Sequence, residues 1–170
     1  DPFVMMHKIA SYEISHTVLQ RHIASKGKPI IFSTGASEYD DIDFALGHLR
    51  ECGAKEVAIL QCTAKYPAAL DDIHVAEVAA LRARYNVPVG LSDHSREPTV
   101  APAAAVALGA CIIEKHYTLD NRLPGADHPF AVEPDELRDL VNAVRATERV
   151  RGKAGKHVSA AERGLFIVDE

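Results

Sequence analysis

Short continuous runs of apolar residues alternate along this chain with longer segments in which apolar residues recur at helical spacing. The five runs have the length of buried strands. Strands are predicted at 6–11, 29–35, 57–63, 87–91 and 111–114, and helices at 12–25, 40–52, 72–85, 98–108 and 133–151. Because neighbouring parallel strands need a crossover connection, this alternation predicts a parallel α/β sheet with helices on its outside.

All the predicted strands end in polar side chains, not only those at one point of the sheet. These strand ends are Lys8 and Ser11, Ser33 and Thr34, Thr63 and Tyr66, Ser92 and His94, and Glu114 and His116. An open sheet gathers its site at one switch point, whereas a barrel uses the carboxyl ends of all its strands. The sequence therefore favours an α/β fold of the (β/α)8 TIM-barrel type, with about five strand–helix units present.

The chain divides into a partial barrel, residues 1–151, and a C-terminal tail, residues 152–170. The tail is polar and at first basic, so most of it is not expected to pack. Its one apolar run, 165–168, has the composition of a strand that needs a partner.

Composition narrows the class of protein. With 170 residues, of which 47% are hydrophobic and 25% charged, the chain is globular and has room for one sizeable core. A formal charge of −5 and the absence of a basic stripe argue against nucleic acid or an anionic membrane as the main partner. No apolar run reaches the roughly 18 to 20 residues of a membrane span, and no signal-peptide layout opens the chain. We therefore expect a cytoplasmic location.

Three cysteines, Cys52, Cys62 and Cys111, are an odd number at wide spacing. This pattern favours buried free thiols over a disulfide or a metal site.

Two histidines, His94 and His116, follow adjacent predicted strands. Their imidazoles can lie close enough to bind one divalent metal and leave positions open for water and substrate. Three alternatives stay open from the residues alone: a histidine with a structural hydrogen bond, an Asp93 that only orients its neighbours, and a Glu114 that pairs with Lys115.

An anion site is the second chemical prediction. Ammonium and hydroxyl donors at the strand ends suit a phosphate or a carboxylate, and they are Lys8, Ser11, Ser33 and Ser92. For any single serine, the favoured explanation is still a helix cap or a solvated strand end. Asp127 and His128, in the loop 118–132, either reach back over the site or belong to a structural turn. No glycine-rich nucleotide fingerprint occurs.

Six motifs, in order along the chain, resemble those of the sialic acid synthases, which join phosphoenolpyruvate to an N-acylated aminosugar and release phosphate. The motifs span Lys8 to Glu13, Phe32 to Gly35, Gln61 to Pro67, Gly90 to His94, Glu114 to Thr118 and Pro124 to His128. The resemblance implies a (β/α) barrel, small-molecule substrates and a homodimer. The sugar would be N-acetylmannosamine, a relative leading to legionaminic or pseudaminic acid, or a spore-coat precursor.

The resemblance also assigns roles to residues. It implies that His94 and His116 hold a divalent ion, Mn²⁺ or Mg²⁺, which polarises the sugar aldehyde. The residues that it assigns to phosphoenolpyruvate are Lys8, Ser11, Ser33 and Ser92. Tyr66 and Asp127 would face the sugar, and Glu13 and Glu114 would be active-site carboxylates.

Two departures from the family pattern limit what can be carried over. Ala64 stands where some members have an asparagine that contacts phosphoenolpyruvate. By the resemblance the chain starts at the fourth barrel strand, so we expect three strands and an antifreeze-like C-terminal domain to be missing. The isolated chain is then expected to be inactive. A non-catalytic metal- or phosphate-binding half barrel that works by assembly is the main alternative, and a different metal-dependent aldolase is a weaker one.

Overall fold

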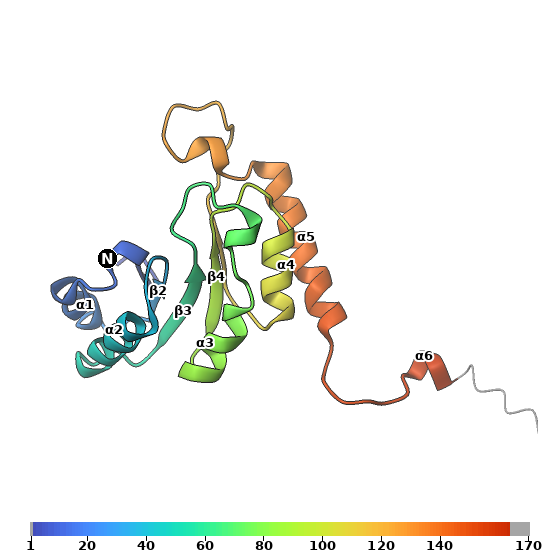
Figure 1. Cartoon of the computed structure of the whole chain (residues 1–170), viewed down its shortest axis with the longest axis horizontal. Coiled ribbons are helices and arrows are strands. Elements are labelled where there is room, and N and C mark those ends of the chain that lie inside the picture. Colours follow the sequence, from blue (N-terminus) through green and yellow to red (C-terminus); the bar gives the residue numbers. More distant parts are fainter. Residues whose placement is uncertain (1, 164–170) are drawn as a thin grey trace, which may run out of the picture.

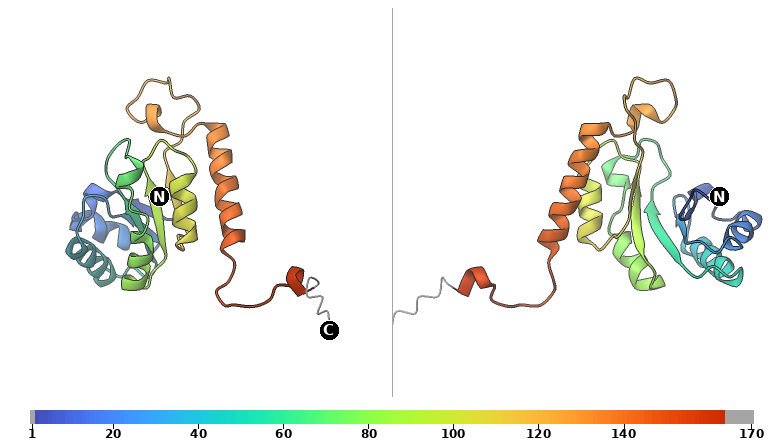
Figure 2. Two further views of the ribbon diagram at one scale, coloured as in Figure 1. Left: turned by 45° about the vertical axis from the view of Figure 1, so that its right-hand side comes forward. Right: turned by 180° about the vertical axis from the view of Figure 1, so that it is seen from behind.

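The computed structural model describes residues 2–163, and its centre is one parallel sheet of five strands in the order β1-β2-β3-β4-β5. The strands are β1 His7–Ile9, β2 Ile30–Ser33, β3 Val57–Cys62, β4 Val89–Asp93 and β5 Ile113–Lys115. The sheet curls into half a barrel, and the helices lie along the outside of the curl (Figures 1 and 2). The predicted barrel type and its five strands are confirmed.

Each strand is followed by helical structure, as the alternation predicted. The α-helices are α1 Thr17–Ala24, α2 Tyr39–Glu51, α3 Glu77–Tyr85, α4 Val100–Ala107, α5 Pro134–Arg151 and α6 Ala160–Arg163. Short 3-10 turns occur at Ser11–Glu13, Leu70–Asp72 and His128–Phe130. The short α6 lies in the tail, away from the body of the molecule (Figure 1). The strand predicted at 165–168 lies outside the described residues.

Two helices begin later than the apolar spacing indicated. The segment predicted as a helix at 12–25 reaches α-helical geometry only at Thr17, because His16 has a ψ of 82° and its Nδ1 accepts the backbone N–H of Leu19. The segment predicted at 72–85 becomes α-helical only at Glu77, because His74 has a left-handed φ of 50°. Side-chain periodicity reports the buried face but not such reversals of the backbone.

Strand residues alternate between the two faces of the sheet, as the pleat requires. Ile9, Phe32, Ile59 and Leu91 are fully buried in the core between the strands and the helices. Their neighbours along each strand point to the concave face. On that face Leu60 packs over Gly90, where an added Cβ would lie 2.7 Å from Leu60 Cδ2 and 2.3 Å from a backbone oxygen. This contact fills the layer beneath the strand ends and leaves the polar residues above it.

The three cysteines are free, as predicted. Only Cys62 is buried, however, and Cys111 is exposed. The prediction that all three are buried is wrong, because Cys111 precedes β5, the edge strand of the sheet that residues 2–163 form. In the described range, no helix combines the length and the apolar character that crossing a bilayer requires.

The core predicts a measurable stability effect. Leu91→Ala leaves a cavity between β4 and the helices, so we expect the free energy of unfolding to fall by about 2–5 kcal/mol in urea titrations. Val150→Ala, at a side chain that is 87% exposed, is the matched control and should change it by less than about 0.5 kcal/mol. Equal effects of the two substitutions would contradict the assignment of this face to the core.

Candidate functional site

The carboxyl ends of the first and last strands meet through one carboxylate on the concave face. Glu114 Oε1 accepts a hydrogen bond from Ser92 Oγ at 2.7 Å and one from Lys8 Nζ at 3.0 Å. Lys8 belongs to β1 and Glu114 to β5, so this ion pair crosses the mouth of the half barrel. The curl of the sheet therefore brings together three predicted site residues that are up to 106 positions apart.

His94 has a defined orientation. Its Nδ1 lies 2.8 Å from the backbone oxygen of Thr63. Since a carbonyl oxygen only accepts, this contact assigns the proton to Nδ1 and leaves the Nε2 lone pair free. Nε2 lies 3.5 Å from Ser92 Oγ, which faces the concave side. A histidine that is held by a backbone carbonyl through one nitrogen presents the other as a ligand, which is the usual arrangement at metal sites.

The second imidazole faces the first. The ring centroids of His94 and His116 are 5.3 Å apart, and Tyr66 covers both, at 4.1 Å from the ring of His94. Phe130 packs against the other side of His116 at 5.1 Å. His116 Nδ1 lies 3.6 Å from Asp127 Oδ2. Rings and one carboxylate thus surround the pair.

The surroundings of His116 favour its neutral form. Burial has the largest effect and the neighbouring His94 the next, and together they hold the pKa of His116 below its usual value of 6.5. The carboxylates of Asp127 and Glu114 oppose this shift. A lowered pKa keeps the imidazole unprotonated at neutral pH, which is the form that binds a metal.

Ser11 and Ser33, two of the predicted site serines, lie at the same end of the sheet but differ in their hydrogen bonds. Ser11 Oγ accepts the backbone N–H of Gly35 at 3.0 Å. Ser33 Oγ is buried, its residue only 1% exposed, and it has no hydrogen-bond partner among the described residues. Buried hydroxyls are nearly always bonded, so an unpaired one at a strand end suits a ligand oxygen.

Glu13 is the predicted site residue that this cluster does not include. Its Oε2 accepts the backbone N–H of Ala10 at 3.2 Å, in the turn that follows β1. It makes no hydrogen bond to another predicted site residue within the described part of the chain. Its role therefore stays a prediction.

Several contributors could not be read from the sequence. Thr63 acts through its backbone oxygen, and Phe130 comes from a 3-10 turn in the long loop. Tyr12 Oη donates to the backbone oxygen of Ala64 at 3.1 Å and ties two site loops together. The suggested pair of Glu114 with Lys115 is wrong, because Lys115 points to the other face and binds Asp93.

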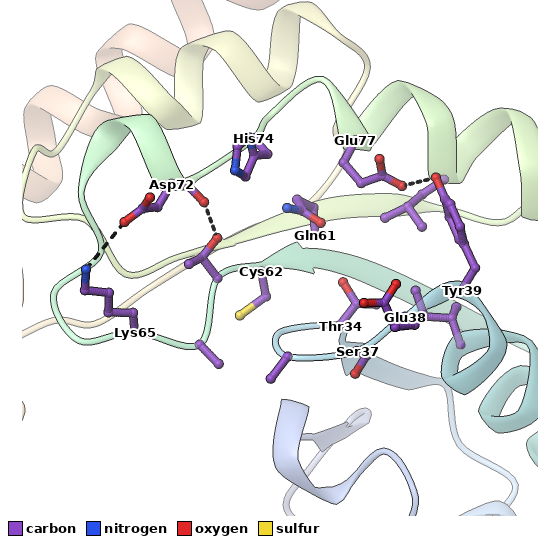
Figure 3. Close-up of a pocket in the computed structure, with 15 residues that line it drawn as sticks. Thr34, Ser37, Glu38, Tyr39, Gln61, Cys62, Lys65, Asp72, His74 and Glu77 are labelled. Carbon is purple, nitrogen blue, oxygen red and sulfur yellow. Dashed lines mark hydrogen bonds and ion pairs between the residues drawn. The ribbon is translucent and has the colours of Figure 1, made fainter.

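Two cavities flank this cluster. A cavity of about 360 Å³ adjoins His116 and is lined by Asp127 and His128 of the long loop. Another of about 620 Å³ opens between α2 and α3, around Gln61 and Glu77 (Figure 3). None of the predicted site residues lines the larger one. They lie on the concave face, where the polar strand ends converge, and we place the candidate site there.

The cluster fits a divalent ion in its donor chemistry. It offers the free Nε2 of His94 and the neutral imidazole of His116. Residues 2–163 contain no group of three or more histidine, cysteine, aspartate or glutamate side chains arranged to hold a metal. Two protein nitrogens would therefore leave positions for oxygen ligands from water or substrate.

Fold and site together define a (β/α)-barrel protein whose polar residues gather at the carboxyl ends of its strands. The model of the NeuB family matches residues 1–156, and the chain belongs to this family. The resemblance to the sialic acid synthases is thereby confirmed.

The similar proteins are considerably longer than this chain. Spore coat polysaccharide biosynthesis protein SpsE of Bacillus subtilis is 47% identical over 142 residues, which are 83% of this chain and 38% of that protein. N,N'-diacetyllegionaminic acid synthase of Campylobacter jejuni is 39% identical over 92% of this chain and 47% of its own length. The structure of N-acetylneuraminic acid synthetase from Leptospira borgpetersenii superposes with a TM-score of 0.89 at 32% identity, covering 96% of this chain and 57% of that one.

The surroundings of His116 lead to a titration prediction. We expect NMR titration of its ring to give a pKa below 6.5, and His94→Ala to raise it, because that change removes part of the burial of His116 and the neighbouring His94 ring, which both lower its pKa. His22→Ala, an exposed change on α1, is the control and should leave the His116 titration unchanged. A His116 titration that does not respond to His94→Ala would contradict the observed ring contact.

Proposed function

We propose that this chain carries part of the active site of a synthase that condenses phosphoenolpyruvate with an N-acylated aminosugar and releases phosphate. Membership of the NeuB family and similarity to a legionaminic acid synthase and an N-acetylneuraminic acid synthetase support this function. The observation that carries it is the concave face, where an imidazole pair adjoins lysine and serine donors. Sialic, legionaminic, pseudaminic and spore-coat sugars all stay candidate products.

The imidazole pair would hold Mn²⁺ or Mg²⁺ through His94 Nε2 and the neutral His116. A divalent ion bound there supplies a Lewis acid for the aldehyde oxygen of the open-chain sugar. The bond from His94 Nδ1 to Thr63 keeps its other nitrogen pointed at the concave face. Tyr66 and Phe130 pack against the two rings.

Phosphoenolpyruvate would bind through its two anionic groups. Lys8 supplies an ammonium, and the hydroxyl donors are Ser11, Ser33 and Ser92. Ser33 gains a partner on binding, since its hydroxyl has none among the described residues. Ser92 now donates to Glu114, so its proton would turn from that carboxylate to the anion. Glu114 is then free to orient the attacking water.

The sugar would lie against Tyr66 and Asp127, beside the cavity next to His116. The methylene carbon of phosphoenolpyruvate attacks the aldehyde carbon, which forms the new carbon–carbon bond. Water adds to the resulting cationic carbon, and the proton it loses passes to the alkoxide left on the former aldehyde oxygen. The tetrahedral intermediate then collapses to the keto acid, and its hydroxyl proton leaves with the phosphate. Glu13 is the remaining carboxylate that we assign to this chemistry, by its place in the first motif.

Mn²⁺ binding tests the imidazole pair. We expect calorimetry on the 170-residue chain to give one Mn²⁺ site, and His94→Ala or His116→Ala to abolish it, because each removes one of two protein ligands. His22→Ala on α1 is the matched histidine control and should bind as the unmodified chain does. Full Mn²⁺ binding by the His94→Ala chain would contradict the proposed site.

Turnover separates the synthase from a non-catalytic half barrel that works by assembly. We expect the isolated chain to release no phosphate from phosphoenolpyruvate with Mn²⁺ and N-acetylmannosamine, because β1 and β5 are the two edges of the half barrel in residues 2–163 and Lys8 and Glu114 are paired with each other. The measurement is phosphate release together with detection of the sugar acid. Product above the level of a Lys8→Ala chain would contradict the expected inactivity and favour an autonomous enzyme.

A further inference from the structure

One buried ion pair adjoins both histidines without touching the concave face. Asp93 precedes His94 at the end of β4, and Lys115 precedes His116 at the end of β5. The two are partners in the register of the parallel strands. Since alternate residues point to opposite faces, the charged pair lies on the helix side and the imidazole pair on the concave side.

The ammonium group of Lys115 lies within hydrogen-bond distance of four oxygen atoms. Lys115 Nζ lies 2.6 Å from Asp93 Oδ2, and the two side chains are 4% and 0% exposed. Nζ also donates to the backbone oxygens of Ser95 at 2.7 Å and Glu97 at 2.9 Å, with Ser95 Oγ at 3.2 Å. Asp93 Oδ1 accepts the backbone N–H of Ser95 at 2.8 Å. The residues on both sides of His94 are thus held from one point on β5.

We infer that Lys115 and Asp93 are positioning residues, which fix His94 relative to His116 so that one ligand can reach both rings. The inference rests on the proposed function, because it gives the imidazole pair a shared ligand. Backbone pairing between β4 and β5 ends at Asp93 and Lys115, so it does not hold the two histidines themselves. Beyond that point His94 O accepts the backbone N–H of Ala68 and His116 O that of Val132, and the ion pair adds the contact that links the two strands to each other. A site of this kind tolerates displacements of only about 0.5 Å.

The pair differs from the other charged contacts of the site. Lys8 and Glu114 lie on the concave face and are about one-third exposed, so a ligand can reach them. Lys115 and Asp93 are closed off by the strands and the β4–α4 loop. They therefore act on a ligand only through the histidines that follow them.

The test compares variants of the 170-residue chain. Lys115→Met leaves the buried Asp93 carboxylate unpaired and is expected to lower stability as well. Lys115→Met combined with Asp93→Val replaces the ion pair by an apolar pair, which removes the buried charge but not the fold. Lys115→Arg keeps the charge, but its planar guanidinium does not match the same set of acceptors. Arg138→Met, which breaks the exposed pair with Asp135 on α5, is the control.

Two measurements distinguish a change in the position of His94 from a change in the stability of the chain. We expect the double variant to lose less stability than Lys115→Met alone, because no buried charge is left unpaired, but to bind Mn²⁺ about 10- to 100-fold more weakly, the usual cost of losing a partner that orients a ligand. Lys115→Arg should give a smaller loss. In the metal-free chain, ¹⁵N-detected histidine spectra should show the Nδ1–H form of His94, and this signal should be lost or mixed in the double variant.

The outcomes are distinct. Unchanged Mn²⁺ affinity and unchanged His94 ring signals in both the double variant and Lys115→Arg would overturn the inference. If the unmodified chain binds no Mn²⁺ while His94 shows its Nδ1–H form, the proposed function fails. The ring signals of the variants then decide the inference by themselves.

Discussion

Burial of every second strand residue beneath the helices is the constraint on which this structure depends. Ile9, Phe32, Ile59 and Leu91 contribute one layer of that core, each worth about 1.5–3 kcal/mol when its side chain leaves water. A slip of one residue in any strand would expose its apolar set and bury its polar set. The same burial that stabilises the fold therefore sends Ser33, Ser92 and Glu114 to the opposite face.

The curl of the sheet turns that opposite face into a site. In a flat sheet, β1 and β5 would be too far apart for their side chains to meet. Here the ammonium of Lys8 donates a hydrogen bond to the carboxylate of Glu114. Beneath this ion pair, Leu60 packs over Gly90 and fills the interior. Only the polar ends of the strands are left lining the mouth of the half barrel. The imidazole pair and the carboxylate of Glu114 lie at this level, and Ser33, whose hydroxyl has no hydrogen-bond partner among residues 2–163, is in register with Leu60.

The charged contacts in this chain differ in how much they contribute to stability. Exposed pairs, such as Arg138 with Asp135, contribute about 0–1 kcal/mol because water competes for both partners. The pair of Lys115 with Asp93 is buried, and removing one partner from such a pair typically costs about 3–5 kcal/mol. That cost measures the uncompensated charge more than any net stabilisation. What the pair gives this protein is a fixed position, because several acceptors hold the ammonium of Lys115 in one place.

The sequence by itself determined the alternation of strands and helices, the barrel type and the polar strand ends, because apolar spacing reports which side of each element is buried. Its six motifs also identified the family. It placed the starts of the helices at 17 and 77 too early, since His16 and His74 leave helical geometry without any change in side-chain pattern. Only the tertiary structure decided which charges pair, that His94 is held by the backbone of Thr63, and that the Ser33 hydroxyl has no hydrogen-bond partner within residues 2–163. Those facts depend on contacts between residues distant in sequence. Lys8 and Lys115 both stand in strands, and the register of those strands places their side chains on opposite faces of the sheet.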